Sequence, residues 1–392
     1  MLKHKYFAIF GGGGIRGISY CGAYKALQEN NIDLTGCAGS SIGAVFASLI
    51  SVGYNYDEIY EIVGNIGVGL LKDINIDLKK EVGFSKGNIF LEWMREVIEK
   101  KYYGENYEKN KMRPVLFSDI KSNLIIYSVD LTNLKFKEFS KEKTPDYEIA
   151  RAVRASVSMP GLSTPMEEDN KLFVDGDLLK STPLWRVTNS IKNWDERILE
   201  FRLEDNIATK QIQNSFDYIN RVYNAICGFA TDYIIDLYNE KDKFDYIKIN
   251  TPGVSVVDFL IPKEKRQELF NTGYEVTKEY LSEILPEKRI KNKEKYQKLL
   301  KTLLKIQKEL DKDKVFEAYY TLCEIFMHAF DEKKYIDSRV SEMLSKFKKL
   351  FLENYNVVNF LGIKKASIEN KEEISKYLLD IIKFITLKDE EL

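Results

Sequence analysis

The first 285 residues alternate short apolar runs with segments of helical periodicity. Residues 6–10 form an unbroken β-prone run that ends at four glycines, and residues 35–40 form a second such run. Residues 18–29 place their apolar side chains on one helix face, and residues 42–52 are almost wholly apolar. Continuous apolar strands joined by helices are typical of buried parallel sheets. We therefore expect an α/β fold in which helices sandwich a mostly parallel sheet.

The same pattern continues through the rest of this region. Glycines and acidic residues break the periodicity of residues 55–85, which predicts short helices and loops near the mouth of a cleft. Further strands are expected at 124–130, 171–174, 198–203 and 246–249, a hairpin-like segment at 134–139, and helices at 87–101 and 147–156.

The composition changes after Pro286. No further strand is predicted, and four helical stretches follow at about 291–310, 314–330, 333–354 and 371–387. We therefore divide the chain into an α/β domain (1–285) and a C-terminal helical region (286–392) with a regulatory, membrane-docking or oligomerisation role. From Pro286 to Leu310, nine basic residues stand against three acidic ones. This excess fits either a solvated helix face or attraction to anionic lipid headgroups.

Composition and charge narrow the class of protein. The 392 residues carry 59 Lys and Arg against 60 Asp and Glu, so nothing global indicates nucleic-acid binding. The four cysteines lack CxxC spacing, which argues against a zinc site or a disulfide framework and favours a reducing compartment. No apolar run is long enough to span a membrane, and the run at 6–10 is too short for a signal peptide. We expect a cytoplasmic protein.

A glycine-rich loop follows the first predicted strand. Its pattern, Gly12-x-Gly14-x-x-Gly17, opens a helix, as a dinucleotide-binding loop does. Such a site also needs an acidic residue that ends the second strand, whereas Asp33 precedes that strand. The alternative is an oxyanion hole, in which glycine N–H groups stabilise the oxygen that becomes negative during acyl transfer. Arg16 would either anchor the loop or contact a substrate phosphate.

The second predicted strand runs into Gly39-x-Ser41-x-Gly43, the pattern of a nucleophile elbow. A sharp turn of this kind lifts a serine hydroxyl clear of the sheet, and the flanking glycines allow a close approach of the backbone. A five-residue pattern also recurs by chance. The significance of Ser41 therefore depends on a residue that can accept its proton.

Few side chains are placed to act as that base. His4 precedes the first strand, at the edge opposite to the one where α/β sites form, and His328 lies in an apolar helical stretch. A carboxylate is the better candidate. Asp175 ends a predicted strand and should lie at the same sheet edge as Ser41, although an Asp-Gly turn would also explain it. Asp130 also ends a strand, but the residues that follow it favour a cap or a turn.

Together these motifs resemble the patatin-like phospholipase family. The family combines a Gly-Gly-Gly-x-Arg/Lys-Gly loop, here at 12–17, with a Gly-x-Ser-x-Gly elbow, here at 39–43. Its Asp-Gly-Gly/Ala motif is similar to Asp175-Gly176-Asp177. Its Ala-Ser-x-Ala-x-Pro block resembles residues 154–160, and Pro183 also matches. The resemblance spans about residues 5–205 and continues more faintly to about 285.

The resemblance implies a Ser-Asp dyad in which Ser41 attacks an ester carbonyl and Asp175 takes and then returns the proton. It implies a lipid acyl hydrolase without metal or cofactor, of phospholipase A or lysophospholipase type, which forms an acyl-enzyme on membrane phospholipids. Peripheral contact with the membrane is expected, and a homo-oligomer stays open. The oxyanion hole would comprise Gly12, Gly13 and Gly14, and the supporting residues would be Arg16, Gly17, Gly39, Ile42, Gly43 and Gly176.

Two positions depart from the family pattern. Gly11 stands where the family has an aspartate, and Asp177 stands where it has Gly or Ala. A carboxylate at Asp177 would raise the pKa of Asp175 if the two side chains face each other. Other functions fit the same motifs: an acyltransferase or thioesterase, a signal-activated effector that degrades membranes, or, outside the enzymes, a nucleotide-binding or scaffold protein that uses the glycine loop.

Overall fold

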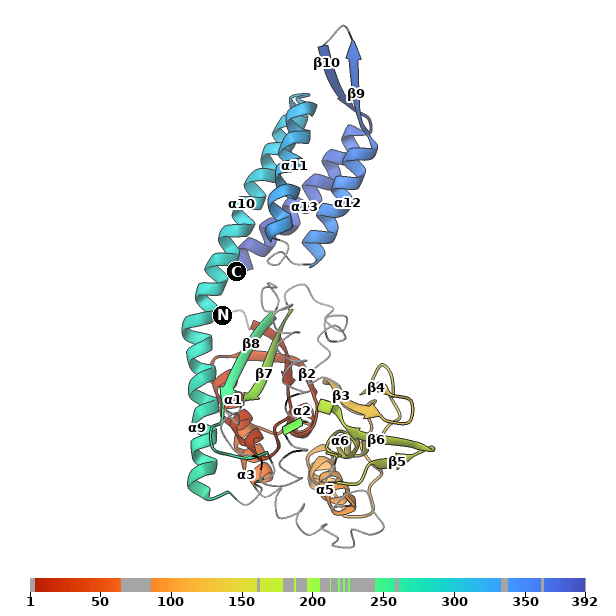
Figure 1. The fold of residues 1–392 in the computed structure, drawn as a ribbon, viewed down its shortest axis with the longest axis vertical. Coiled ribbons are helices and arrows are strands. Elements are labelled where there is room, and N and C mark those ends of the chain that lie inside the picture. Colours follow the sequence, from red (N-terminus) through yellow and green to blue (C-terminus); the bar gives the residue numbers. More distant parts are fainter. Residues whose placement is uncertain are drawn as a thin grey trace. The chain divides into compact units, whose positions relative to one another are not determined.

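The computed structural model describes most of the chain and divides it into two compact units (Figure 1). Unit 1 comprises Met1–Asn239 and Phe244–Leu281, and unit 2 comprises Glu240–Lys243 and Ser282–Leu392. This division lies close to the boundary expected after residue 285. The described residues are 4–64, 86–160, 163–178, 187, 196–204, 212, 218, 221–222, 225, 244–256, 258, 261–332, 338–360 and 363–391.

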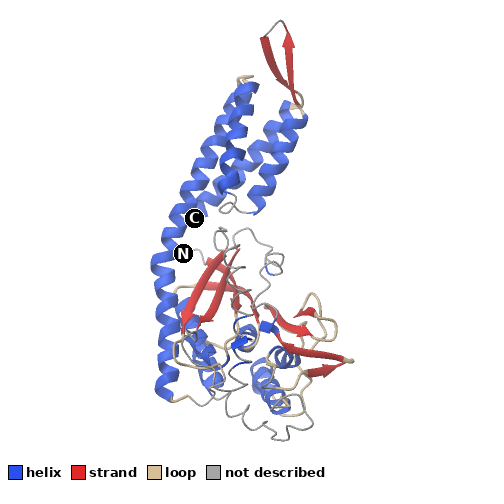
Figure 2. Ribbon diagram, viewed as in Figure 1, coloured by secondary structure: helices blue, strands red, loops and turns tan. Residues whose placement is uncertain are grey.

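A mostly parallel sheet forms the centre of unit 1 (Figure 2, red). From edge to edge it contains β5 (Met166–Glu168), β6 (Lys171–Asp175), β3 (Asn123–Asp130), β2 (Ile32–Gly39), β1 (His4–Phe10), β7 (Glu196–Glu204) and β8 (Phe244–Asn250), with β4 (Lys135–Ser140) paired to β3. The path from β3 to β8 is parallel throughout. By contrast, β4 and β6 pair antiparallel with β3. The predicted α/β fold is confirmed.

Helices flank this sheet. They are α1 (Ile18–Glu29), α2 (Ile42–Ser51), α3 (Tyr56–Gly64), α5 (Asn88–Tyr103), α6 (Ile149–Ser156) and α9 (Lys263–Glu279), with the 3₁₀ turns η1 (Gly14–Gly17), η2 (Gly104–Asn106) and η3 (Gly176–Leu178). For residues 55–85 the sequence predicts short helices and loops. The structure has α3 at the start of this segment, and residues 65–85 lie outside the described part of the chain.

Apolar side chains bury both faces of the sheet. On one face the Phe10 and Phe201 rings stack at a centroid distance of 5.4 Å, and Tyr20 of α1 and Phe46 of α2 pack against Phe10. Successive strand residues point to opposite faces. Phe7 therefore packs on the other face, in a cluster with Ile9, Ile125, Ile198 and Phe244. Burial on both faces explains why these strands appear in the sequence as continuous apolar runs.

Unit 2 combines helices with one β-hairpin. The π-helical turn η5 (Tyr280–Ile284) crosses from unit 1 into unit 2 along the chain. The elements of unit 2 are α10 (Leu285–Asp311), α11 (Val315–Glu332), α12 (Ser338–Glu353), α13 (Lys371–Glu391), β9 (Tyr355–Phe360) and β10 (Ile363–Ile368). Leu299, Leu303, Ile306 and Leu310 recur every three or four residues along α10 and are buried in a core shared with the other three helices. The four expected helices are present, and the hairpin is an element that the pattern did not predict.

Several lysines of α10 lie apart from these buried residues. Lys298, Lys301, Lys305 and Lys308 are exposed. This distribution fits a solvated helix face, while attraction to anionic lipid stays a prediction. Among the helices described, none is both long enough and apolar enough to cross a bilayer.

Candidate active site

Ser41 occupies a strained turn between β2 and α2. Its backbone angles are φ 52° and ψ −129°, and it is the N-cap residue of α2. A residue other than glycine held in such a sparsely populated region costs on the order of 1–3 kcal/mol, and strained residues of this kind cluster at active sites. A Cβ on Gly43 would lie 1.9 Å from Phe10 O, and one on Gly39 would lie 2.1 Å from Gly43 O. The turn therefore needs both glycines, as a nucleophile elbow does.

The glycine loop lies against this serine. Phe10 at the end of β1 pairs with Gly39 at the end of β2, so the loop and the elbow leave the sheet at the same edge. A Cβ on Gly12 would lie 3.1 Å from the Cβ of Ser41. Arg16 is buried, and its Nε donates to Gly13 O at 3.1 Å. This contact fits the anchoring role considered for Arg16, while contact with a substrate phosphate stays a prediction.

The loop offers two free donors instead of the three expected. The Gly12 N–H donates to the Asp177 carboxylate. Among the described residues, the N–H groups of Gly13 and Gly14 have no main-chain partner. We therefore expect Gly13 and Gly14 to be the donors of the predicted oxyanion hole of Gly12, Gly13 and Gly14, because a donor that already binds a carboxylate is not available to a developing oxyanion.

Asp175 lies at the same height along the strands as the elbow, but the pairing of β6 explains this, and the position of Asp175 at a strand end does not. It ends β6, which runs antiparallel to β3, so a strand end alone does not place it at the edge used by the parallel strands. β6 pairs with β3 only near its end, with Asp175 opposite Ser128. Ile126, two residues earlier on β3, pairs with Gly39. Asp175 is thus at the level of Ser41, beyond the end of β2.

Main-chain and hydroxyl groups hold both residues in place. Asp175 is 1% exposed, its N–H donates to Ser158 O at 2.9 Å, and its Oδ1 accepts the Asp177 N–H at 2.9 Å. The Ser41 N–H donates to Ser156 Oγ at 3.0 Å. Within the described residues, the Ser41 hydroxyl makes no hydrogen bond to Asp175. Catalytic hydrogen bonds are often long in ligand-free sites and shorten when substrate binds.

Residues 154–160 support the site in a way that the sequence did not reveal. Ser156 and Ser158, which contact Ser41 and Asp175, belong to this segment. Arg154 is buried and fixes it, because Nη1 donates to Ser158 Oγ and Nε donates to Gly87 O at 3.1 Å. The only signal for this role was the resemblance of the segment to a family block.

Close packing accounts for the remaining supporting residues. A Cβ on Gly176 would lie 2.3 Å from Tyr127 O, so this glycine lets η3 pass next to β3. A Cβ on Gly17 would lie 2.5 Å from Ile42 Cγ1, so this glycine lets η1 pack on α2. Both contacts bring the predicted motifs together in space.

The alternative bases are not part of this arrangement. Asp130 accepts hydrogen bonds from Asn133 N at 3.1 Å and Asn133 Nδ2 at 2.8 Å, so it caps a turn. Burial alone would raise the pKa of Asp130, but these hydrogen bonds outweigh it and lower the pKa. His4 begins β1, at the opposite sheet edge, and His328 lies on α11 of unit 2. Asp33 also lies near the start of its strand, away from the glycine loop, which disfavours a ribose-binding role.

The chain is similar in sequence and in fold to known proteins. Residues 8–187 match the family described as patatin-like phospholipase. This segment is similar in sequence to patatin-like phospholipases. An uncharacterized protein of Acanthamoeba polyphaga mimivirus is 26% identical to the chain over 286 residues, which is 70% of this chain and 93% of that protein.

Two further relatives extend the comparison. A protein of Invertebrate iridescent virus 6 named as a probable lipid hydrolase is 28% identical over 197 residues, 47% of this chain and 64% of that protein. The crystal structure of VipD from Legionella pneumophila has a TM-score of 0.52 at 17% identity and covers 98% of this chain and 88% of that one. The fold of the chain is thus shared with a solved structure.

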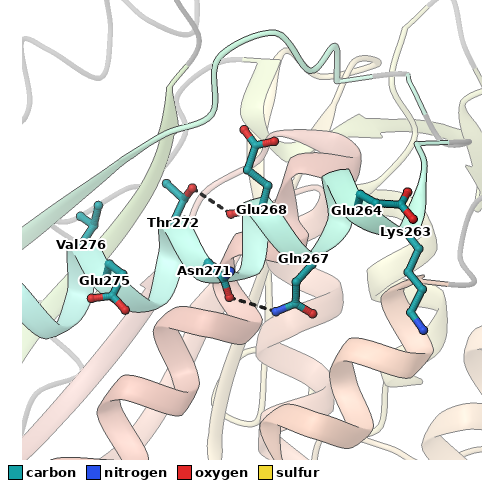
Figure 3. A pocket seen from close by; sticks show the side chains of 8 residues that line it. All are labelled: Lys263, Glu264, Gln267, Glu268, Asn271, Thr272, Glu275 and Val276. Carbon is teal, nitrogen blue, oxygen red and sulfur yellow. Dashed lines mark hydrogen bonds between the residues drawn. The ribbon is translucent and has the colours of Figure 1, made fainter.

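The part of the chain that the structure describes gives no indication of a metal centre. No group of three or more His, Cys, Asp or Glu side chains there is arranged to hold a metal ion. A hollow of about 830 Å³ lies along α9 (Figure 3). It is lined by Lys263, Glu264, Gln267, Glu268, Asn271, Thr272, Glu275 and Val276, none of which is a predicted site residue.

Proposed function

We propose that the patatin-like domain is a serine lipid acyl hydrolase of phospholipase A or lysophospholipase type. One observation carries the proposal: Ser41 stands in a strained turn beside a glycine loop, at the level of the buried carboxylate of Asp175. This combination suits a nucleophile, oxyanion donors and a base at one sheet edge. The family match and the relative named as a probable lipid hydrolase support a lipid ester as the substrate.

In the proposed reaction, the Asp175 carboxylate accepts the Ser41 Oγ proton while Oγ attacks the ester carbonyl carbon. The N–H groups of Gly13 and Gly14 stabilise the resulting oxyanion, and the positive end of the α2 dipole adds to this field. As the tetrahedral intermediate collapses, the bond to the lipid alcohol breaks and the alcohol oxygen takes the proton from Asp175. Water then gives a proton to Asp175 and attacks the acyl-Ser41 carbonyl, releasing the fatty acid and returning the proton to Ser41.

The proposed substrate also sets the place of action. Phospholipid acyl esters lie in membranes, so the enzyme would work from the cytoplasm as a peripheral membrane protein. The exposed lysines of α10, including Lys301 and Lys305, would favour anionic surfaces. Hydrolysis on anionic and neutral vesicles, compared between wild type and a Lys301→Gln/Lys305→Gln variant, tests this part. An equal loss on both surfaces would argue against a headgroup contact.

A fluorophosphonate probe tests the nucleophile directly. The probe forms a covalent adduct with an activated serine and releases its leaving group. We expect labelling of wild type, with the adduct mapped to Ser41 by peptide mass spectrometry, and no labelling of Ser41→Ala. Labelling that persists in Ser41→Ala, or an unlabelled wild-type protein at every pH tested, would exclude the serine mechanism.

A further inference from the structure

Asp177 connects the three segments that form the candidate site. Its carboxylate accepts hydrogen bonds from the hydroxyl of Ser40, the residue before Ser41, and from the N–H of Gly12. Its own main-chain N–H donates to Asp175 Oδ1 at 2.9 Å. The elbow, the glycine loop and the proposed base therefore meet at one residue.

The buried carboxylate of Asp177 has cations nearby. Burial raises its pKa, and Arg202 and Arg16 act in the opposite direction. Arg202 is itself buried, with its Nε 3.2 Å from Glu200 Oε1. A Cβ on Gly11 would lie 2.2 Å from Arg202 Nη1, so the missing side chain at Gly11 leaves room for this cation. These partners lower the cost of burying the Asp177 charge without cancelling it, so its pKa is still raised above the usual value.

The contact with the glycine loop is also a close one. A Cβ on Gly12 would lie 1.8 Å from Asp177 Oδ2, so the carboxylate lies directly against the loop backbone. Because the same carboxylate binds the loop and Ser40, it sets the distance between loop and elbow. Misplacement of a reacting group by about 1 Å can lower a rate by about 10²-fold.

We propose that Asp177 is a positioning residue that holds the Gly12 loop against the elbow, so that the remaining loop N–H groups face the carbonyl attacked by Ser41. The inference rests on the proposed hydrolase function for its kinetic consequence, but not for the contact itself. Asp177 acts through its hydrogen bonds and takes no part in proton transfer.

Two substitutions separate positioning from other roles. Asp177→Ala removes both contacts, and we expect kcat on a soluble ester to fall by about 10²–10³-fold, as when an oxyanion donor is lost, with KM nearly unchanged. In Asp177→Asn, the amide oxygen still accepts from Gly12 N–H, and the NH₂ group donates to the Ser40 hydroxyl, which also accepts. We therefore expect this conservative variant to recover most of kcat.

Asp130→Ala is the matched control, because Asp130 is also buried and its carboxylate also accepts from a main-chain N–H, that of Asn133. It should leave kcat unchanged. A wild-type kcat in Asp177→Ala would overturn the proposal. So would an Asp177→Asn variant as inactive as Asp177→Ala, because that result would mean that the charge of Asp177 matters and its hydrogen bonds do not. If Asp177→Ala does not fold, Ser40→Ala decides, with a lowered kcat expected and an unchanged kcat contradicting the proposal.

Amide hydrogen exchange tests the contact without relying on activity. In Asp177→Ala, the peptide that contains residues 11–17 should exchange faster than in wild type, while Asp130→Ala should leave it unchanged. Unchanged exchange in Asp177→Ala overturns the positioning role whatever the enzyme does. Faster exchange together with an inactive wild type would instead mean that the contact is real and that the proposed hydrolase function is wrong.

Discussion

Ser41 and Asp175 divide the proposed chemistry between an attacking hydroxyl and a carboxylate that takes its proton. We expect Asp175→Asn to lower kcat by about 10²–10⁴-fold, the range typical of general acid–base catalysis. The fold should survive, because Asn still accepts the Asp177 N–H. Asp130→Asn changes a turn cap that binds Asn133 and should leave kcat unchanged. Equal losses in the two variants, measured by steady-state ester hydrolysis, would remove Asp175 from the role of base.

Cys37, in β2, makes stability depend on pH. Burial raises its pKa from 9.0 to about 12, and a hydrogen bond with Ser51 offsets only part of this shift. The folded state therefore keeps a proton that the unfolded chain releases above pH 9, so this stabilisation is present below pH 9 and is lost as pH rises toward 12. In this pH range, the contribution of the Cys37 thiol to the free energy of unfolding should fall by about 1.4 kcal/mol per pH unit.

Urea unfolding at successive pH values above 9 checks this slope. The curve for wild type should fall more steeply than that for Cys37→Ala, because all other titrating groups are shared and cancel in the difference. Parallel curves would show that Cys37 titrates alike in the folded and unfolded states.

Among single residues, the reactive groups could be predicted from the sequence, whereas the residues that they contact could not. An elbow is a local structure, so Gly39-x-Ser41-x-Gly43 could be identified from five residues. The bond between Ser40 and Asp177 joins positions 137 residues apart, and no local pattern encodes it. For the same reason, the contact between Gly12 and the Asp177 carboxylate could not be predicted.

At the scale of elements, the approach of α2 to β1 depends on Gly43. A Cβ there would lie 1.9 Å from Phe10 O, so Gly43→Ala must displace the helix or the strand. We expect a loss of about 1–3 kcal/mol in the free energy of unfolding. In Gly64→Ala, at the end of α3, the added Cβ would lie 3.1 Å from the end of the Arg266 side chain and, among the described residues outside α3, near no other atom. We expect this variant to change the free energy of unfolding by less than about 1 kcal/mol. Equal losses in urea unfolding would contradict the tight contact.

Most strands of unit 1 were predictable from the sequence, whereas their direction was not. Residues 171–174 are a short apolar run in either orientation, and only pairing with β3 makes β6 antiparallel. The hairpin of β9 and β10 follows a long helix and was missed, because its segments are short and part polar. Register and direction depend on partners that are distant along the chain.

At the scale of the whole molecule, each unit has its own core. Leu378 of α13 is fully buried in the core of unit 2, while its neighbour Leu379 is 42% exposed. We expect calorimetry to resolve two unfolding transitions. Leu378→Ala should destabilise one of them by about 2–5 kcal/mol, and Leu379→Ala should have a much smaller effect. A single transition that shifts as a whole would contradict independent cores.

The central claim is that Ser41 cleaves lipid acyl esters. The most direct measurement incubates a mixed phospholipid extract with wild type and with Ser41→Ala, and identifies the products by mass spectrometry. We expect free fatty acid and lysophospholipid, or glycerophospho-alcohol, from wild type alone. Equal release by both proteins, or no release by either, would contradict it.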